Sequence, residues 1–183
     1  MAGSRLLTIR RTEVDLLSFY AILAQDNSAL FCAYTNTSIA VAKQIAQLPA
    51  IVVTNLAAQT DNMRTLFKLR SDWHESIDKA SPLASMDERT HPTLKNILIT
   101  QMSLLFSIRE LAIESTALAM GLTGLSSTQL ALLVNTPVDQ LMRFNCECPV
   151  FNHPFRTERT VKEFFSNARN IKSVEFALDI VAV

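Results

Sequence analysis

Apolar side chains recur at spacings of three and four along most of this chain, which is the periodicity of amphipathic helices. The first such run predicts a long helix that begins after an N-cap at Thr12 and ends near Tyr34. The helix would stop at Thr35-Asn36, because Asn tolerates the left-handed backbone conformation that terminates many helices. The apolar positions of this run are Leu16, Leu17, Tyr20, Leu23, Ala24, Leu30 and Phe31.

Two short helices and a final one are predicted after this long run. Ser38 is a suitable N-cap for a short helix over 39–47. Pro49 then opens a second short helix, because proline is best accepted at the first helical position. After an irregular stretch, Trp73 and Ile77 stand at the i, i+4 spacing of one face of a last helix. These patterns predict a helical unit with a tight corner before Pro49.

The same landmarks recur 88 positions later without any gap. Ser126 followed by Gln129 has the pattern of a capping box. Asn36 and Gly124 stand at the corresponding helix ends. Asn and Gly both tolerate the left-handed conformation of a helix end, so a different residue can specify the same helix end in each repeat. A fixed offset of this kind indicates an internal duplication. The corresponding pairs are Ser38 and Ser126, Pro49 and Pro137, Asn36 and Gly124, Phe67 and Phe155, and Trp73 and Val161.

We therefore expect an all-α fold of two tandem repeats. Residues 1–80 form the first repeat with a basic N-terminal arm, residues 81–96 a linker, and residues 97–183 the second repeat. The second repeat ends in an apolar C-terminal extension, which would pack on the body or on a partner. The two long helices are expected to pair as an intramolecular pseudo-dimer. The leucines expected at that interface are Leu16, Leu17, Leu23, Leu30, Leu104, Leu105, Leu111 and Leu118.

The net charge is zero, with 17 Lys and Arg against 17 Asp and Glu. A protein that coats nucleic acid alone has a basic excess, so DNA contacts here would be few, local or shared with a more basic partner. Arg5, Arg10 and Arg11 in the N-terminal arm would either pack on the body or contact a phosphate or a partner. The sequence has no signal-peptide core and no uncharged apolar run of about 18 residues, which predicts a cytoplasmic protein without a membrane span.

No stretch of the sequence has the pattern of a catalytic or cofactor site. The three histidines lie in unrelated settings, and three glycines are too few for a phosphate-binding loop signature. Cys146-Glu147-Cys148 with His153 resembles a metal cluster, but Cys-x-Cys is too close for the common zinc knuckle and a fourth ligand is not evident. We therefore expect two semi-buried thiols, no metal, no cofactor and no enzyme activity.

The helix pairs that meet at Pro49 and Pro137 could be helix–turn–helix units that read DNA. The helix after Pro49 carries no cation, so a compact structural corner is the better interpretation. Other basic residues are stronger candidates for phosphate contact, although Glu158 and Glu163 are interleaved with them and a solvated face explains them about as well. The candidates for DNA binding are Arg64, Lys68, Arg70, Arg143, Arg156, Arg159 and Lys162.

Most of the chain resembles FlhD, the D subunit of the bacterial flagellar master activator, present twice. In the second repeat the resemblance is carried by Leu104 through Glu114, Ala117 to Leu122, Leu130 to Leu133, Thr136-Pro137, Leu141 and Phe155-Arg156. In the first repeat the same order appears at Leu16-Leu17, Asp26, Ala29 to Phe31, Ile45-Ala46, Leu48-Pro49 and Phe67-Lys68.

The resemblance implies a transcriptional activator subunit. In this family two D chains form a dimer, D dimers assemble with a zinc-binding FlhC subunit, and the heteromer binds promoter DNA and activates RNA polymerase. Relatives on conjugative elements activate transfer genes, and a divergent duplicated chain is similar to that branch. Some members carry a cysteine near the Phe-Arg stretch that bridges two protomers, and here only the second repeat has cysteines nearby. The alternative is a helical interaction module that regulates a partner without contacting DNA.

Overall fold

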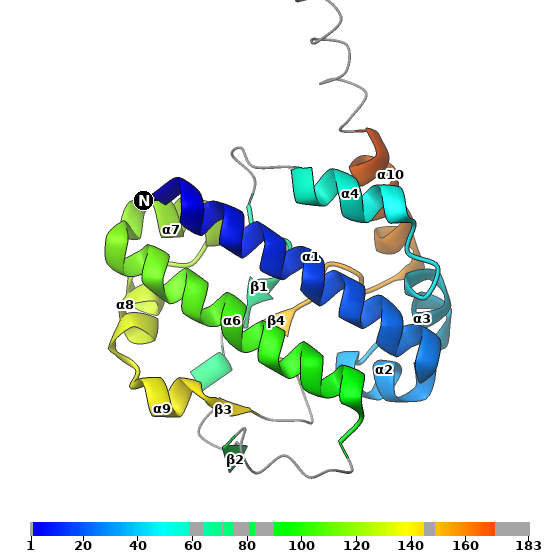
Figure 1. Ribbon diagram of the computed structural model, residues 1–183, viewed down its shortest axis with the longest axis horizontal. Coiled ribbons are helices and arrows are strands. Elements are labelled where there is room, and N and C mark those ends of the chain that lie inside the picture. Colours follow the sequence, from blue (N-terminus) through cyan, green and yellow to red (C-terminus); the bar gives the residue numbers. More distant parts are fainter. Residues whose placement is uncertain are drawn as a thin grey trace, which may run out of the picture.

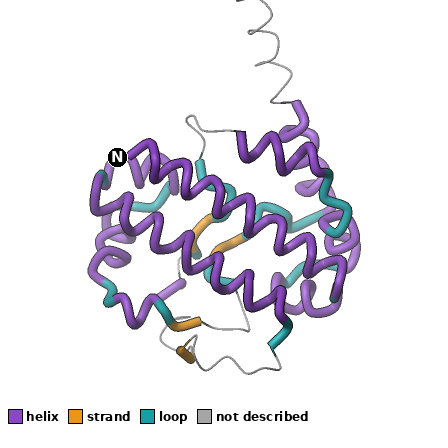
Figure 2. Tube along the Cα trace, viewed as in Figure 1, coloured by secondary structure: helices purple, strands orange, loops and turns teal. Residues whose placement is uncertain are grey.

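Helices dominate the part of the chain that the structure describes, which confirms the prediction of a helical fold class (Figure 2). The computed structural model describes residues 2–58, 64–70, 72–74, 81–82, 90–144 and 149–170. Cys146, Cys148, Ile77 and the C-terminal extension lie outside these residues, so the predictions that concern them stay untested.

Four helices follow one another in the first half of the chain. They are α1 (Ala2–Asp26), α2 (Ser28–Thr35), α3 (Ile39–Ile45) and α4 (Ala50–Ala58). The second half contains α6 (Pro92–Glu114), α7 (Thr116–Thr123), α8 (Ser127–Asn135), α9 (Val138–Leu141) and α10 (Glu158–Asn170). Helix α6 begins within the segment predicted as a linker, and α9 provides four residues of the helix predicted after Pro137.

The first long helix differs from its prediction at both ends. Helix α1 already contains Thr12, whose hydroxyl donates to the carbonyl of Thr8 at 2.9 Å instead of capping a helix start. The apolar pattern continues to Tyr34, but the backbone departs from helical geometry at Asn27. The Asn27 side chain accepts a hydrogen bond from the Leu30 N–H at 3.0 Å and so caps a new helix. One apolar run therefore covers two helices.

The residues predicted as a basic N-terminal arm belong to α1. Arg5 forms ion pairs with Glu110 at 3.3 Å and Glu114 at 3.1 Å. Arg10 is 6% exposed and pairs with Glu13 at 2.7 Å. Arg11 is exposed, and the Arg5 side chain is 38% exposed. The Arg5 ion pairs thus join the N-terminal helix to α6, as the packed alternative expected, whereas the Arg10–Glu13 pair lies within α1.

Helix ends occur at matching positions in the two halves. Helices α1 and α6 end 88 positions apart, and the same offset relates the starts and ends of α2 and α7. Asn36 (φ 54°) and Gly124 (φ 72°) both end the second helix in the left-handed conformation, as predicted. Ser38 and Ser126 cap the next helix, and Ser126 forms the expected capping box with Gln129.

Short strands connect the two halves, with one pair near the middle of the molecule and the other at its lower edge in Figure 1. Strand β1 (Lys68–Leu69) pairs antiparallel with β4 (Phe151–Asn152), so that Lys68 lies opposite Asn152. Strand β2 (Ser81–Pro82) pairs antiparallel with β3 (Arg143–Phe144). The sequence predicted an irregular stretch at β1 and part of a linker at β2, so these strands are additions to the predicted architecture.

Helices α1 and α6 lie side by side and run in opposite directions across one face of the molecule (Figure 1). The ion pairs of Arg5 near the start of α1 with Glu110 and Glu114 near the end of α6 fix this direction. The predicted interface leucines on α1 and α6 are all buried, whereas Leu30 on α2 and Leu118 on α7 are half-buried. Helix α10 from the second half packs on α3 and α4 from the first half, so the core is shared between the halves.

One described helix, α6, is long and apolar enough to span a membrane when judged by length and composition alone. Half of that stretch is buried inside the fold, where the helix packs against α1. Two bent pairs, α3 with α4 and α7 with α8, would qualify only if each were a single span, and they are bent by 72° and 113°. The packing of α6 favours its use as a core helix, and the cytoplasmic location stays a prediction.

Candidate functional site

Two buried side chains at corresponding positions of α1 and α6 hold the segments that lead into the central strands. The Glu13 Oε1 accepts hydrogen bonds from the backbone N–H groups of Leu66 and Phe67, the latter at 3.2 Å. The Gln101 Oε1 accepts from the N–H groups of Val150 at 2.9 Å and Phe151 at 3.4 Å. We call these two arrangements the Glu13 clamp and the Gln101 clamp.

The clamp hydrogen bonds show that the constant offset of 88 does not give the correct residue correspondence near the central strands. Glu13 and Gln101 are 88 positions apart, but the N–H groups that they hold are 84 positions apart. Phe67 therefore corresponds to Phe151 in its place in the fold, and not to Phe155 as the constant offset predicted. Phe155 is also buried, with its ring centroid 6.4 Å from that of Phe67. The offset therefore changes between the start of α4 and Leu66, since α4 and α9 still begin 88 positions apart.

The two clamps differ in electrostatics. The Glu13 side chain is fully buried, and burial raises its pKa from 4.5 to about 7, while the nearby Arg10 charge and the Phe67 and Leu66 N–H groups oppose this rise. Gln101 supplies the same acceptor atom without a charge, and its Nε2 donates to the Tyr34 hydroxyl at 2.8 Å. The position corresponding to Arg10 is Leu98, which is buried. One clamp is ionic and the other is neutral.

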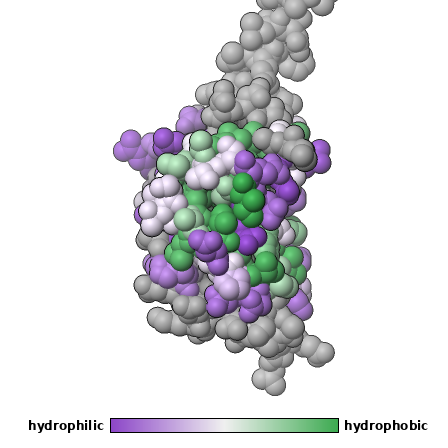
Figure 3. Space-filling model, turned by 90° about the vertical axis from the view of Figure 1, so that its left-hand side faces the viewer, coloured by the Kyte–Doolittle hydropathy of each residue, from purple (hydrophilic) through white to green (hydrophobic). Residues whose placement is uncertain are grey.

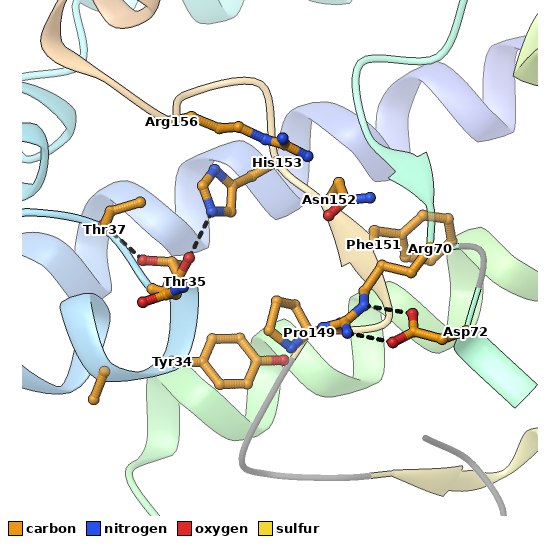
Figure 4. Close-up of a pocket in the computed structure, with 12 residues that line it drawn as sticks. Tyr34, Thr35, Thr37, Arg70, Asp72, Pro149, Phe151, Asn152, His153 and Arg156 are labelled. Atoms are coloured by element: carbon orange, nitrogen blue, oxygen red, sulfur yellow. Dashed lines mark hydrogen bonds and ion pairs between the residues drawn. The ribbon is translucent and has the colours of Figure 1, made fainter. Parts of the chain in front are cut away.

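A polar pocket of about 690 Å³ lies where the corner between α2 and α3 meets β4 and the segment after it (Figure 4). The pocket combines residues from both halves of the chain. Its lining consists of Ala33, Tyr34, Thr35, Asn36, Thr37, Arg70, Asp72, Pro149, Phe151, Asn152, His153 and Arg156.

His153 fixes the β4 segment to the end of α2. Its Nε2–H donates to the carbonyl of Thr35 at 2.9 Å, and its ring stacks on Phe155 with a centroid distance of 5.0 Å. Burial lowers the pKa of His153 below its ordinary value of 6.5, and the nearby positive charge of Arg156 lowers it further. The carbonyl of Thr35 opposes this shift. The imidazole is therefore neutral at pH 7.

The two arginines of the pocket have different environments. Arg70 binds Asp72 in a bidentate ion pair, with Nε–Oδ1 and Nη2–Oδ2 distances of 2.9 and 2.6 Å. This hydrogen bonding lowers the pKa of Asp72, so the carboxylate stays charged and neutralises the guanidinium. Arg156 is exposed and, among the described residues, makes no ion pair. Figure 4 shows its side chain on the same side of the pocket as His153.

The predicted DNA-binding residues fall into separate places. Arg70 and Arg156 line the pocket, Lys68 is exposed on β1, and Arg64 is exposed before it. Arg159 and Lys162 are exposed on α10, where Arg159 pairs with Glu163 at 2.7 Å. Arg143 lies on β3, and its side chain is outside the described part. The prediction that these cations serve one function stays a prediction.

No cluster of three or more metal-ligating side chains occurs within the described ranges. His153, the histidine of the metal-like sequence cluster, is used to bind the backbone of Thr35. Comparison with models of protein families, with curated proteins and with solved structures finds no match to this chain. Its function must therefore be argued from the arrangement of its own residues.

Proposed function

We propose that the chain is a duplicated FlhD-like subunit whose two halves form a pseudo-dimer. The observation that carries the proposal is the repeated arrangement of helix ends, caps and clamps, together with the antiparallel pairing of α1 with α6 and of β1 with β4. Antiparallel pairing of equivalent elements is what a two-fold axis produces between identical subunits. Covalent linkage supplies the second half at high effective concentration, so no second chain is needed for this pairing.

On this basis the chain acts as a subunit of a transcriptional activator. It would assemble with a zinc-binding FlhC-like partner, and the complex would bind promoter DNA and recruit RNA polymerase, with conjugative-transfer genes as the candidate targets. The zero net charge and the dispersed cations support a shared mode of DNA binding, because isolated cations give little affinity at physiological salt. The exposed candidates for contacts made within the complex are Arg64 and Lys68 near β1 and Arg156, Arg159 and Lys162 in the second half.

The competing function is a helical module that binds a regulatory partner and never touches DNA. Apolar side chains gather on the side of the molecule formed by α7, α8 and the start of α1 (Figure 3). Ile113 on α6, Met120 on α7 and Leu132 on α8 are 54%, 39% and 43% exposed. Such a surface suits protein contact in either function, so only a DNA measurement separates the two.

The decisive experiment is a mobility shift with promoter DNA at physiological salt, using the chain, its partner and both together. The activator function predicts a specific shift only for the mixture. Charge reversal in the double variant Arg156→Glu/Arg159→Glu should abolish that shift while the protein complex stays intact by gel filtration. Lys95→Glu, an exposed position on α6, serves as the matched control. Tight specific binding by the chain alone, or an unchanged shift with the double variant, contradicts the proposal.

A further inference from the structure

The pocket lies at the corner between α2 and α3, and one residue accounts for a difference in backbone contact from the corresponding corner between α7 and α8. At the corner between α7 and α8, the Thr65 N–H donates to the carbonyl of Leu122 at 2.9 Å and joins the segment before β1 to the end of α7. The residue corresponding to Thr65 at the other corner is Pro149, which has no N–H to donate. There the side chain of His153 makes the connection to Thr35 instead.

The side chains of the pocket also differ from those at the corresponding positions of the other half. Leu69, which is apolar, corresponds to His153. Asp72 corresponds to Arg156 and itself lines the pocket, where it pairs with Arg70. A space bounded by a histidine, an asparagine amide and an arginine is lined for polar contact, whereas a core cavity is lined by apolar groups. The corner with Pro149 thus carries the chemical lining of a binding site.

The charges of the lining favour an anion. Asp72 neutralises Arg70 through two hydrogen bonds, and His153 is neutral. Arg156 contributes the remaining positive charge, and no carboxylate among the described residues pairs with it. A guanidinium binds phosphate and carboxylate groups through two parallel N–H···O hydrogen bonds. The pocket therefore offers one uncompensated cation at the edge of a polar cavity.

We propose that this pocket binds a small organic anion, with its phosphate or carboxylate on Arg156 and its polar body between Asn152 and Thr37. A volume of about 690 Å³ is within the range of small-molecule sites and accommodates a ligand the size of a mononucleotide. A phosphate of DNA has the same anionic chemistry, but it belongs to a convex duplex and would leave the cavity behind Arg156 unfilled. The inference shares Arg156 with the proposed DNA contacts, so its test compares small probes with DNA.

Isothermal titration calorimetry on the full chain tests this site with adenosine monophosphate, inorganic phosphate and succinate, each up to about 10 mM. The expected result is saturable binding of at least one probe with one site per chain. Arg156→Gln should weaken this binding by about tenfold or more, as expected for the loss of a charge-assisted pair. Arg159→Gln removes the same charge from α10 outside the pocket and should leave the affinity unchanged.

Three outcomes overturn the proposal. The first is the absence of saturable binding for all three probes. The second is equal weakening by Arg156→Gln and Arg159→Gln, which would reflect general surface charge. The third is binding of a short DNA duplex that depends on Arg156 while none of the small probes binds or competes with it, which would make Arg156 a contact for DNA phosphate. Thermal melting of both variants confirms that they are folded.

Discussion

The Glu13 clamp and the Gln101 clamp perform the same task with different electrostatics. Each places one side-chain oxygen against two backbone N–H groups that would otherwise be buried without partners. The neutral clamp has no charge to desolvate and has Leu98 beside it, whereas the ionic clamp requires Arg10 as a buried counter-charge. The fold therefore requires an acceptor at this position, and the charge is an additional feature of one half.

The two corners, like the two clamps, occupy corresponding places in the fold but carry different side chains. At the corner between α7 and α8, the Thr65 N–H donates a hydrogen bond to the Leu122 carbonyl. At the corner between α2 and α3, Pro149 has no N–H, His153 contacts Thr35 instead, and a polar pocket is present. If the halves derive from one duplicated unit, residues should be exchangeable between corresponding positions at a cost set by their local partners. The following predictions use such exchanges.

The largest effect is expected for Glu13→Leu. This change removes the acceptor of the Leu66 and Phe67 N–H groups and leaves Arg10 buried without its partner, which costs about 3–5 kcal/mol in the free energy of unfolding. The double variant Arg10→Leu/Glu13→Gln reproduces the Leu98 and Gln101 pair and should recover most of this loss. Urea denaturation measures both. A cost below about 1 kcal/mol for the single variant, or no recovery in the double variant, contradicts the equivalence of the clamps.

The pH dependence of stability should also distinguish the clamps. Because the folded pKa of Glu13, about 7, is raised above its ordinary 4.5, the folded state binds more protons than the unfolded state between these values. The free energy of unfolding should therefore fall as pH rises through this window, by up to about 3 kcal/mol from Glu13. His153 acts in the opposite direction, since its lowered pKa makes stability fall with decreasing pH.

The difference between the wild-type chain and the Arg10→Leu/Glu13→Gln variant isolates the Glu13 contribution, because both retain His153. Urea denaturation at several pH values between about 4.5 and 8 gives this difference directly. Identical pH slopes for the two proteins would show that Glu13 does not titrate in this window.

An intermediate effect is expected at the corner between α7 and α8. Thr65→Pro removes the N–H that donates to Leu122 and leaves that carbonyl without this partner, at a cost of about 1–3 kcal/mol. Thr65→Ala keeps the backbone N–H and is the matched control. Thermal and urea denaturation should place the proline variant well below the alanine variant. Equal stabilities would mean that the backbone hydrogen bond does not hold this corner.

The smallest effect is expected for Gly124→Asn. The first half already accommodates Asn36 in the same left-handed conformation, and a Cβ at Gly124 meets no atom within 4 Å. The cost should stay below about 1 kcal/mol, whereas Gly124→Val should cost about 1–2 kcal/mol because a β-branched residue strongly disfavours positive φ. Denaturation midpoints compare the two. A similar loss for Asn and Val would show that the two helix ends are not equivalent.

Local chemistry made the helix ends predictable from sequence. Ser38, Ser126, Asn36 and Gly124 act within a few residues of their own position, so their identities predict their roles. The break at Asn27 was not predicted, because the apolar period continues across it and the cap depends only on one side-chain hydrogen bond.

Long-range features of the site could not be predicted in the same way. The pocket forms where residues 33–37 meet residues 149–156, and nothing local in either segment indicates the other. Arg70 and Arg156 were identified as basic candidates, but their shared location depends on the pairing of β1 with β4. Glu13 was not among the predicted site residues, and its polarity among buried neighbours was the overlooked signal for the clamp.

The mass of the purified full chain in solution tests the proposed intramolecular pseudo-dimer most directly. Sedimentation equilibrium between about 1 and 100 µM follows any self-association by mass action. A chain that already contains both halves of the dimer should remain a monomer of 20.4 kDa across this range. A concentration-dependent increase toward twice that mass would show that the chain still requires a second copy, and would contradict the account.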